Sequence, residues 1–320
     1  MEVKKRPLGK TGMYVTPIGL GMMEFAGGGG LMGFVFPIVD QQVKNATIKA
    51  GLDNGVNWFD TAELYGAGIS ERSLAIGLKT AGVNDQDVII ATKWWPLFRT
   101  ARNIPKTIAE RLRFLDGYSI DLYQIHQPFS FSSPEAEMDA MAELVKAGKI
   151  RSVGVSNFNA SQMRRAHRQL QKYGIPLASN QVHYSLLHRN IEGDGTLAAA
   201  KELGITIIAY TPIESGLLSG KYHKNPELLN GKGRFYRTQL QAGLERSRKL
   251  VAELEEIASR YGVTAAQIAL NWVINSQGET VVTIPGVTKV SQAEESAGAM
   301  KFELTGDEIA RLSEVSKAAV

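Results

Sequence analysis

The 320-residue sequence contains no cysteine. This absence excludes disulfides, thiolate catalysis, and zinc or iron–sulfur sites that are built on cysteine. The chain also lacks a run of the ~18 apolar residues that a membrane-spanning helix needs. Its first residues, Met1–Arg6, lack the apolar segment of a signal peptide. We therefore expect a cytoplasmic protein with no membrane partner.

Charge of one sign is not concentrated in any segment. The formal net charge is +4, and no block of like charges is present, so we expect no nucleic-acid partner. Hydrophobic residues at 44% and charged residues at 21% are typical of a globular protein with a large core. No linker or low-complexity tract divides the sequence, so we predict a single domain over residues 1–320.

Short apolar runs alternate with helix-like segments along most of the chain. The expected strands are Ile18–Gly21, Val56–Phe59, Val88–Thr92, Asp121–Ile125, Ser152–Val155, Ala178–Val182, Thr206–Tyr210 and Val281–Ile284. Continuous apolar strands are typical of a parallel sheet that is covered on both faces. Eight strand–helix repeats predict an α/β fold, namely a closed (β/α)8 TIM barrel.

Helix boundary signals support the same alternation. Asn103, Asn159 and Thr264 precede segments with helical apolar spacing, so each is expected to cap a helix, and the helix after Asn159 is expected to extend to Tyr173. Ser133, followed by Pro134, marks another helix start, and Gly148 marks the end of that helix.

Two segments fall outside the repeat. Lys4–Pro7 and Met13–Val15 flank a glycine-containing turn, which predicts a β-hairpin that caps the barrel bottom. Residues 213–243 are predicted to form a long loop after the seventh strand. Loops of this length in compact domains are usually functional or disordered.

A glycine-rich segment after the first strand fits the spacing of a dinucleotide-binding fingerprint, with Gly28, Gly30, Gly33 and the acidic Asp53. Its context does not fit, because the nearest expected strand ends near Gly21 and Pro37 blocks a helix after the last glycine. We interpret the segment as a loop that borders the carboxyl end of the first strand.

Ionisable side chains end three of the apolar runs. Asp60, Lys93 and His126 each follow one run, and Tyr65 lies five residues after Asp60. Each residue alone also fits a structural role, as a turn cap, a solvated strand end, a packed ring or a bonded imidazole. Because chemistry in parallel α/β proteins is placed at the carboxyl ends of strands, the four together predict a proton-transfer site.

The chemistry of this group fits carbonyl protonation. A phenol has a pKa near ~10, and the Lys93 ammonium is expected to lower the pKa of Tyr65. Asp60 would hold the ammonium in place and keep it charged. A neutral His126 would orient a carbonyl oxygen, and the phenol would protonate it as negative charge develops.

At these positions the chain resembles the aldo-keto reductase family, and the resemblance covers nearly its full length. The matching stretches are Asp60–Ala62 with Tyr65–Gly66, Ala91–Trp94, Ile125–Pro128, Gly154–Phe158, Asn180–Val182, Ala209–Pro212, Gly216–Lys221 and Ile284–Gly286. The resemblance implies a (β/α)8 barrel that binds NAD(P)H at its carboxyl face. It also implies that Tyr65 is the proton donor, supported by Lys93 and Asp60, and that His126 positions the carbonyl.

The resemblance further implies a set of cofactor-binding residues. Ser156, Asn157 and Gln181 are expected to hydrogen-bond the nicotinamide carboxamide, and Tyr210 to stack on the nicotinamide ring. Amide ligands need donor and acceptor side chains, and planar rings need an aromatic face, so the residue types agree. The residues expected near the pyrophosphate are Thr211, Ile213, Gly216, Leu217 and Lys221.

The adenosine end departs from the family pattern. The residues expected there are Gly286, Lys289, Gln292, Glu295 and Ser296. Lys289 neutralises a 2′-phosphate only as a point charge, and Gln292 and Ser296 stand where many relatives carry Arg and Asn. We expect NADPH as the cofactor, with use of NADH also possible.

Aromatic residues near the strand ends predict an apolar substrate pocket. Phe25, Trp94, Trp95 and Phe129 are the expected substrate contacts, with Met23, Phe98 and Phe131 nearby. This wall favours apolar or aromatic aldehydes and ketones as the small-molecule substrate.

Two other functions remain open at this point. An NADPH-binding accessory or redox-sensor protein, like a potassium-channel β subunit, would share these motifs. A metal-dependent barrel hydrolase using Asp60 and His126 lacks enough clustered ligands, so no metal site is expected. The sequence does not decide between a monomer and a homo-oligomer.

Overall fold

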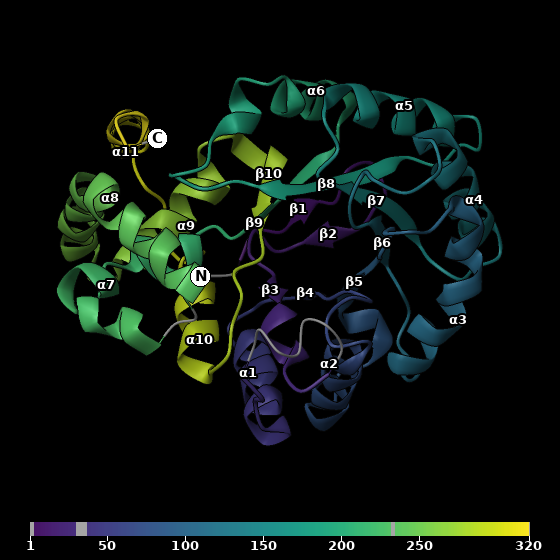
Figure 1. Ribbon diagram of the computed structural model, residues 1–320, viewed down its shortest axis with the longest axis horizontal. Coiled ribbons are helices and arrows are strands. Elements are labelled where there is room, and N and C mark those ends of the chain that lie inside the picture. The colour runs from purple at the N-terminus through teal and green to yellow at the C-terminus, as the bar shows by residue number, and fades with distance from the viewer. Residues whose placement is uncertain (1–2, 30–36, 232–233, 320) are drawn as a thin grey trace.

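Eight parallel strands form the centre of the protein. The computed structural model describes residues 3–29, 37–231 and 234–319. The strands are β3 (Leu20–Gly21), β4 (Trp58–Asp60), β5 (Ile89–Trp94), β6 (Leu122–Ile125), β7 (Ser152–Ser156), β8 (Leu177–His183), β9 (Thr206–Tyr210) and β10 (Val281–Thr283). They are hydrogen-bonded to one another in sequence order and curl into a barrel (Figure 1).

The first and last strands meet through isolated parallel bridges. Ile18 is bridged to Thr283, and Gly21 is bridged to Gly286. The amide of Gly21 donates to the carbonyl of Pro285 at 3.0 Å. The predicted (β/α)8 fold is therefore confirmed.

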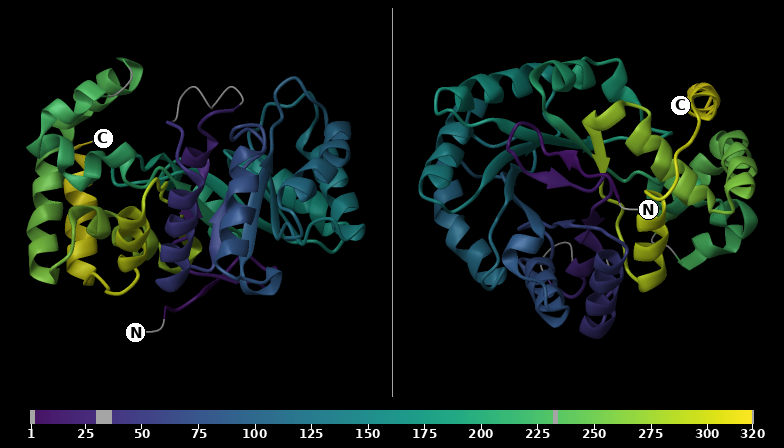
Figure 2. Two further views of the ribbon diagram at one scale, coloured as in Figure 1. Left: turned by 90° about the horizontal axis from the view of Figure 1, so that it is seen from below. Right: turned by 180° about the vertical axis from the view of Figure 1, so that it is seen from behind.

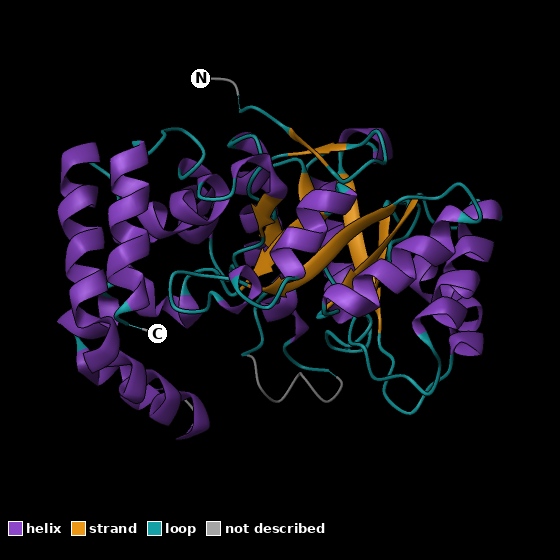
Figure 3. Ribbon diagram, turned by 90° about the horizontal axis from the view of Figure 1, so that it is seen from above, coloured by secondary structure: helices purple, strands orange, loops and turns teal. Residues whose placement is uncertain are grey.

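Helices surround the strands and bury their apolar faces against them. The helices between strands are α1 (Gln41–Asp53), α2 (Ile69–Thr80), α3 (Ile104–Phe114), α4 (Pro134–Lys146), α5 (Ala160–Gln171), α6 (Thr196–Leu203) and α9 (Ala265–Asn275), and α10 (Val290–Gly298) follows the last strand. Three further helices, α7 (Lys221–Lys224), α8 (Arg234–Tyr261) and α11 (Gly306–Lys317), lie outside this repeat. Figure 3 shows α8 and α11 side by side at one flank of the barrel.

Short 3-10 helices occupy the connections. They are η1 (Met23–Ala26), η3 (Asp85–Asp87), η4 (Ala101–Asn103), η5 (Asn190–Glu192), η6 (Glu214–Ser219), η7 (Pro226–Gly231) and η8 (Gly278–Thr280). Among the described residues, no helix has the length and apolar content needed to cross a membrane.

Most of the expected helix caps are present. Asn159 and Thr264 each form reciprocal capping boxes at the starts of α5 and α9. Ser133 Oγ accepts a hydrogen bond from the amide of Ala136 at 3.3 Å. The expectation for Asn103 is wrong in detail. Its side chain accepts a hydrogen bond from the amide of Thr100 at 3.0 Å, so it caps the start of η4 and does not cap α3. The helix after Asn159 ends at Gln171, and not at Tyr173 as predicted.

The N-terminal hairpin closes one end of the barrel, as predicted. Strands β1 (Arg6–Pro7) and β2 (Tyr14–Val15) pair antiparallel and lie across the barrel opening in the right panel of Figure 2. Leu8 and Val15 are buried against apolar side chains from inside the barrel. Gly9 approaches the start of β8 so closely that a Cβ there would lie 2.5 Å from the carbonyl oxygen of Ala178.

The loop predicted over residues 213–243 is largely helical. It contains η6, α7, η7 and the first turns of α8. Lysine and arginine are good helix formers, and a polar exposed helix is stable when one stripe of it packs on the core. Leu240 supplies part of that stripe, since only 5% of its surface is exposed.

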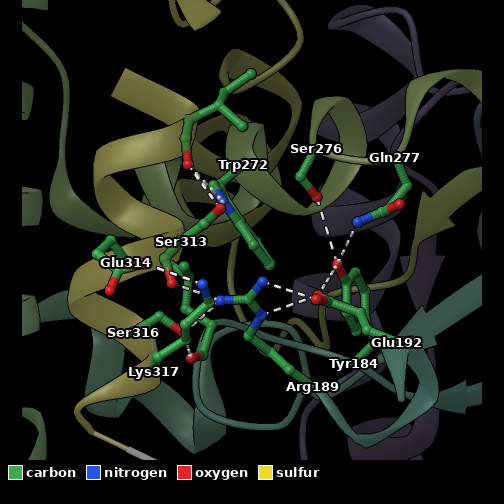
Figure 4. Close-up of polar contacts among 12 residues, drawn as sticks. Tyr184, Arg189, Glu192, Trp272, Ser276, Gln277, Ser313, Glu314, Ser316 and Lys317 are labelled. Carbon is green, nitrogen blue, oxygen red and sulfur yellow. Dashed lines mark hydrogen bonds and ion pairs between the residues drawn. The ribbon is translucent and has the colours of Figure 1, made fainter. Parts of the chain in front are cut away.

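The C-terminal helix α11 is tied to the segment that follows β8. Arg189 Nη1 donates to the carbonyl of Ser313 at 2.6 Å, and Trp272 Nε1 donates to Ser313 Oγ at 2.9 Å. Figure 4 shows this arginine between α11 and Glu192, whose carboxylate it also binds at 2.7 Å. These bonds fix the loop after β8, which borders the carboxyl face of the barrel.

Candidate active site

The predicted catalytic side chains gather at the carboxyl ends of three neighbouring strands. Asp60 is the last residue of β4, Lys93 is the penultimate residue of β5, and His126 directly follows β6. Because side chains alternate across a strand, Asp60 and Lys93 share the inner face with Trp58 and Ala91, which lie two residues earlier. Tyr65 lies in the turn between β4 and α2, and its amide donates to the carbonyl of Ala62 at 3.0 Å.

Lys93 links Asp60 to Tyr65. Its ammonium is fully buried and donates to Asp60 Oδ1, to the carbonyl of Thr61 at 3.0 Å and to the phenol oxygen of Tyr65 at 3.4 Å. An ammonium has three donors, so these contacts use its full capacity. The side chain therefore has one defined position beneath the phenol.

Two buried amides hold the other oxygen of Asp60. Gln124 Nε2 donates to Oδ2 at 3.1 Å and Gln181 Nε2 donates to it at 2.9 Å. A buried carboxylate is costly unless its oxygens are satisfied, and here both are. Gln124 was not among the predicted site residues. It lies two residues before His126, so its side chain points to the same, inner face of the barrel.

The pKa shifts in this cluster differ from the sequence-based expectation. Burial raises the pKa of Tyr65 well above its usual value, and the carboxylate of Asp60 raises it further. The predicted lowering of the Tyr65 pKa is therefore wrong in this structure, because burial and the Asp60 charge both act in the opposite direction. Burial also lowers the pKa of Lys93, while the nearby Asp60 acts in the opposite direction.

His126 lies beside the phenol in an aromatic setting. Its ring is edge-on to Tyr65, with centroids 5.7 Å apart, and edge-on to Trp95 at 5.2 Å. Burial lowers the pKa of His126 well below its usual value, and the positive Lys93 lowers it further. The imidazole is therefore neutral at physiological pH, as the sequence argument expected.

The residues predicted to bind nicotinamide form a hydrogen-bonded chain. Tyr210 OH donates to Asn157 Oδ1 at 3.1 Å, Asn157 Nδ2 donates to Ser156 Oγ at 3.2 Å, and Ser156 Oγ donates to the carbonyl of Gln181 at 2.9 Å. His183 stacks on Tyr210 with ring centroids 5.3 Å apart. The structure therefore brings these four predicted residues together beside Asp60.

The residues predicted near the pyrophosphate lie in the turn after β9. Thr211, Glu214 and Ser215 have positive φ values of 54°, 48° and 54°, which is uncommon for residues other than glycine. A Cβ at Gly216 would lie 2.6 Å from Lys221 Nζ, so the lysine folds back over this glycine. Ile213 is partly buried and Leu217 is buried, so their side chains pack towards the core.

The residues predicted at the adenosine end lie on α10 and the segment before it. Lys289 is exposed at the start of α10. Gln292 Oε1 accepts from both the amide and the hydroxyl of Thr288, at 2.8 and 2.9 Å. Ser296 is buried and Glu295 is partly buried. Gly286, in the segment that follows β10, is exposed.

The four predicted substrate residues divide into two groups. Trp95 is partly exposed, Phe129 is 44% exposed, and their rings lie edge-on to each other with centroids 5.6 Å apart. Phe25 and Trp94 are fully buried in the main core. Trp94 has the parity opposite to Lys93 on β5, so its ring faces the helices, and its burial leaves no surface for a substrate.

Several polar residues near the site escaped the sequence analysis. Glu63 Oε2 accepts from the amide of Trp95 at 3.0 Å, and Oε1 accepts from Arg99 Nη1 at 2.7 Å. Glu63 stands between Asp60 and Tyr65 in the sequence, which was the available signal. In the glycine-rich segment after η1, Gly30 and Gly33 lie outside the described residues.

No metal centre is evident in the part of the chain that the structure describes. Within those ranges, no three or more His, Asp or Glu side chains are grouped so that they could hold a metal ion.

Comparisons with known proteins identify the family. The model of the aldo/keto reductase family matches residues 17–317. The chain is 33% identical to a chloroplastic pyridoxal reductase of Arabidopsis thaliana, over 99% of this chain and 86% of the relative. It resembles the crystal structure of a thermostable aldo-keto reductase, Tm1743, in complex with the inhibitor epalrestat, with a TM-score of 0.79, 29% identity and coverage of 98% and 99%. An aldo-keto reductase from Klebsiella pneumoniae in complex with NADPH aligns with a TM-score of 0.73 and 25% identity, over 98% of this chain and 95% of that one. The chain therefore belongs to the aldo-keto reductase family and is an oxidoreductase.

Proposed function

We propose that this protein reduces aldehydes or ketones with NADPH, and that Tyr65 protonates the carbonyl oxygen. The observation that carries the proposal is the buried Asp60–Lys93–Tyr65 chain, with the His126 ring beside its phenol. A fully satisfied ion pair ending on a phenol has no evident role in packing. It holds a proton donor in a fixed position at the carboxyl face of the barrel.

The raised pKa of Tyr65 is compatible with this role. A phenol with a high pKa stays protonated at physiological pH, so it has a proton to donate. An alkoxide is a stronger base than a phenolate, so the proton moves to the oxygen as its negative charge develops. Lys93 stabilises the resulting phenolate, because its ammonium already contacts the phenol oxygen at 3.4 Å.

His126 is proposed to orient the carbonyl group. A neutral imidazole donates one hydrogen bond without competing with the phenol for the proton. Its lowered pKa keeps it in that form. The edge-on contact with Trp95 holds the ring beside Tyr65.

The residues of the carboxyl face fit a nicotinamide cofactor. A bound nicotinamide supplies the hydride for carbonyl reduction. Ser156, Asn157 and the Oε1 of Gln181 are assigned to the carboxamide, although the Nε2 donor of Gln181 is committed to Asp60. His183 covers one face of the Tyr210 ring, so the opposite face is the one proposed to stack on nicotinamide.

We propose NADPH over NADH because of charge at the adenosine end. Lys289 is exposed and supplies the positive charge for a 2′-phosphate, whereas Gln292 is neutral and its oxygen is engaged by Thr288. One lysine without a bidentate arginine gives a modest preference, so NADH is proposed as a weaker second cofactor. Pyrophosphate contacts are assigned to Thr211, Ile213, Gly216, Leu217 and Lys221, and further adenosine contacts to Gly286, Glu295 and Ser296.

The proposed substrates are apolar or aromatic carbonyl compounds. Trp95 packs edge-on to both His126 and Phe129, and Phe98 and Phe131 contact each other with exposed fractions of 79% and 72%. The backbone amide of Phe131 donates to the carbonyl of Arg99 at 2.8 Å, which joins the two loops that carry these rings. Phe25 and Trp94, which are buried, are not proposed as contacts.

A panel of aldehydes and ketones with NADPH and NADH in parallel tests the proposal. We expect oxidation of NADPH, followed by its absorbance, to be fastest with aromatic aldehydes. Slower turnover with NADH would match the single lysine at the adenosine end. Tight binding of NADPH without turnover of any carbonyl would contradict the proposal and favour an accessory or redox-sensor role.

A further inference from the structure

A glutamate with a buried carboxyl oxygen, which the proposed chemistry does not use, lies next to the site. Glu24 is in η1, directly after β3. A Cβ at Gly286 would lie 2.1 Å from Glu24 Oε1 and 2.5 Å from Oε2, so the carboxyl packs against the segment that follows β10. Its Oε2 is buried and has no hydrogen-bond partner among the described residues.

The surroundings of this carboxyl leave its charge uncompensated. Burial raises the pKa of Glu24 to about 7, and among the described residues only its own backbone N–H favours the ionised form. Glu24 also raises the pKa of Tyr65, so the two side chains are close enough to interact. A buried polar atom without a partner is costly, and such atoms in native proteins are often completed by a ligand.

The position of Glu24 indicates which part of a bound dinucleotide its carboxyl would contact. Tyr65 marks the nicotinamide side of the proposed site, and Gly286 marks the adenosine side. The carboxyl packs against Gly286, and Met23 and Ala26 on either side of Glu24 in η1 pack with Tyr65. The carboxyl therefore lies between the two sides, where the nicotinamide ribose and the pyrophosphate would bind. A pyrophosphate has no hydrogen to donate and repels a carboxylate, whereas ribose hydroxyls donate to one.

We propose that Glu24 accepts hydrogen bonds from the hydroxyl groups of the nicotinamide ribose. The chemistry is the same as that of the acidic residue that binds a ribose in other dinucleotide sites. The inference rests on the proposed function because it requires a bound dinucleotide. It adds a cofactor-positioning residue on the first βα connection, where the sequence analysis assigned none.

The test measures binding without turnover. NADPH is titrated by fluorescence into the unmodified protein and into the Glu24→Ala and Glu24→Gln variants. Two fragments, reduced nicotinamide mononucleotide and 2′,5′-ADP, are measured by displacement. The matched control is Glu279→Ala, which removes an exposed glutamate paired with Lys4 at 2.7 Å.

We expect Glu24→Ala to weaken NADPH and the mononucleotide by about tenfold or more, as for loss of a hydrogen bond to a charged group. Glu24→Gln should fall between it and the unmodified protein, since the amide keeps an acceptor oxygen without the charge. Binding of 2′,5′-ADP should not change in either variant, which also shows that both are folded. Glu279→Ala should bind all three ligands normally.

Three results for Glu24→Ala would overturn the inference. The first is unchanged binding of NADPH. The second is tighter binding of NADPH, which is expected if the carboxylate lies beside the pyrophosphate and repels it, and the third is equal weakening of both fragments. Failure of the unmodified protein to bind NADPH would overturn the proposed function together with the inference. Normal binding by Glu24→Ala would overturn the inference alone.

Discussion

The two ends of the barrel interior differ in polarity, although the same strands build both. At the amino end, β4, β5 and β6 point Trp58, Ala91 and Leu122 inward, against the hairpin residues Leu8 and Val15. Two residues later, the same strands point Asp60, Lys93 and Gln124 inward. One end is sealed by apolar packing, and the other is held by hydrogen bonds and an ion pair.

The difference shows that, in one barrel, the residues that stabilise the fold and the residues proposed to catalyse the reaction lie at opposite ends of the same strands. Apolar packing at the amino end stabilises the fold without creating a reactive group. The polar end buries an ion pair, which is a weak source of net stability but fixes the phenol of Tyr65 in position. Substitutions at the two ends should therefore have different effects on folding and on carbonyl reduction.

The largest effect is expected from Lys93→Met, which breaks the polar end. Removing one partner of a buried ion pair leaves the Asp60 charge uncompensated and should cost about 3–5 kcal/mol of unfolding free energy. Carbonyl reduction should fall about 10²–10⁴-fold, because the phenol loses its support. Urea unfolding and NADPH oxidation measure the two losses.

Two controls separate the causes of this effect. The double variant Asp60→Asn/Lys93→Met should recover much of the stability but none of the activity, since it removes the uncompensated charge. Lys79→Met, which breaks an exposed pair with Asp116, should cost less than about 1 kcal/mol. A Lys93→Met variant with normal stability and normal turnover would contradict the comparison.

Trp58→Ala disrupts the apolar packing at the amino end of the barrel. We expect it to lower the unfolding free energy by about 3–5 kcal/mol, because it leaves a cavity and removes a hydrogen bond from Trp58 Nε1 to the carbonyl of Thr16. The value of kcat/KM for the folded variant should stay within about threefold of normal, because the substitution leaves the residues that stabilise the transition state at the carboxyl end in place. A loss of activity without a loss of stability would argue against the division between the two ends.

A smaller effect is expected from Gln124→Leu. This variant removes one of the two amides that donate to Asp60 Oδ2. A hydrogen bond to a charged group contributes about 1.5–3 kcal/mol, so kcat/KM should fall about tenfold. The matched control Gln169→Leu, which removes a buried amide on α5 that donates to Asp139, should leave kcat/KM unchanged.

The smallest expected effect is that of pH on kcat. The pKa of His126 lies well below its usual value and that of Tyr65 lies well above, so neither titrates between about pH 7 and pH 9. With saturating NADPH, kcat should be flat over that range. A bell-shaped profile centred there would contradict the assigned protonation states.

The same histidine gives a pH dependence of stability. The unfolded chain protonates its histidines near pH ~6.5, whereas the folded protein keeps His126 neutral to lower pH. The unfolded state therefore binds more protons below that pH, and the His126 contribution to stability falls as pH drops. Unfolding free energies of the unmodified protein and of His126→Gln, measured from about pH 7 to pH 5, would show this difference.

The fold and the catalytic cluster were largely predictable from the sequence. Strands with continuous apolar runs predicted a covered parallel sheet, and the polar residues that end them predicted the side of the barrel that carries chemistry. Gln124 could have been found as well, because it lies two residues before His126 on the same face of β6. The parity of β5 also shows that Trp94 points away from Lys93.

What the sequence did not predict depends on three-dimensional surroundings. The pKa of Tyr65 rises because of its burial and the nearby Asp60 carboxylate, and neither effect is visible in the residue order. Gln181 carries the amide expected for a cofactor contact, but its donor is directed at Asp60. Residues 213–243 resemble a loop in composition, and only the packing of Leu240 into the core reveals the helix. The single-domain organisation and the cytoplasmic location stay predictions.

The most direct test of the central claim compares two tyrosine hydroxyls at opposite ends of the barrel. Tyr65→Phe removes the phenol above Lys93, and Tyr118→Phe removes a hydroxyl that donates to the carbonyl of Val83 at 2.7 Å on the amino side. With NADPH and an aromatic aldehyde, Tyr65→Phe should lower kcat about 10²–10⁴-fold, whereas Tyr118→Phe should leave it nearly unchanged. Equal turnover by Tyr65→Phe and the unmodified protein would contradict the assignment of Tyr65 as the proton donor.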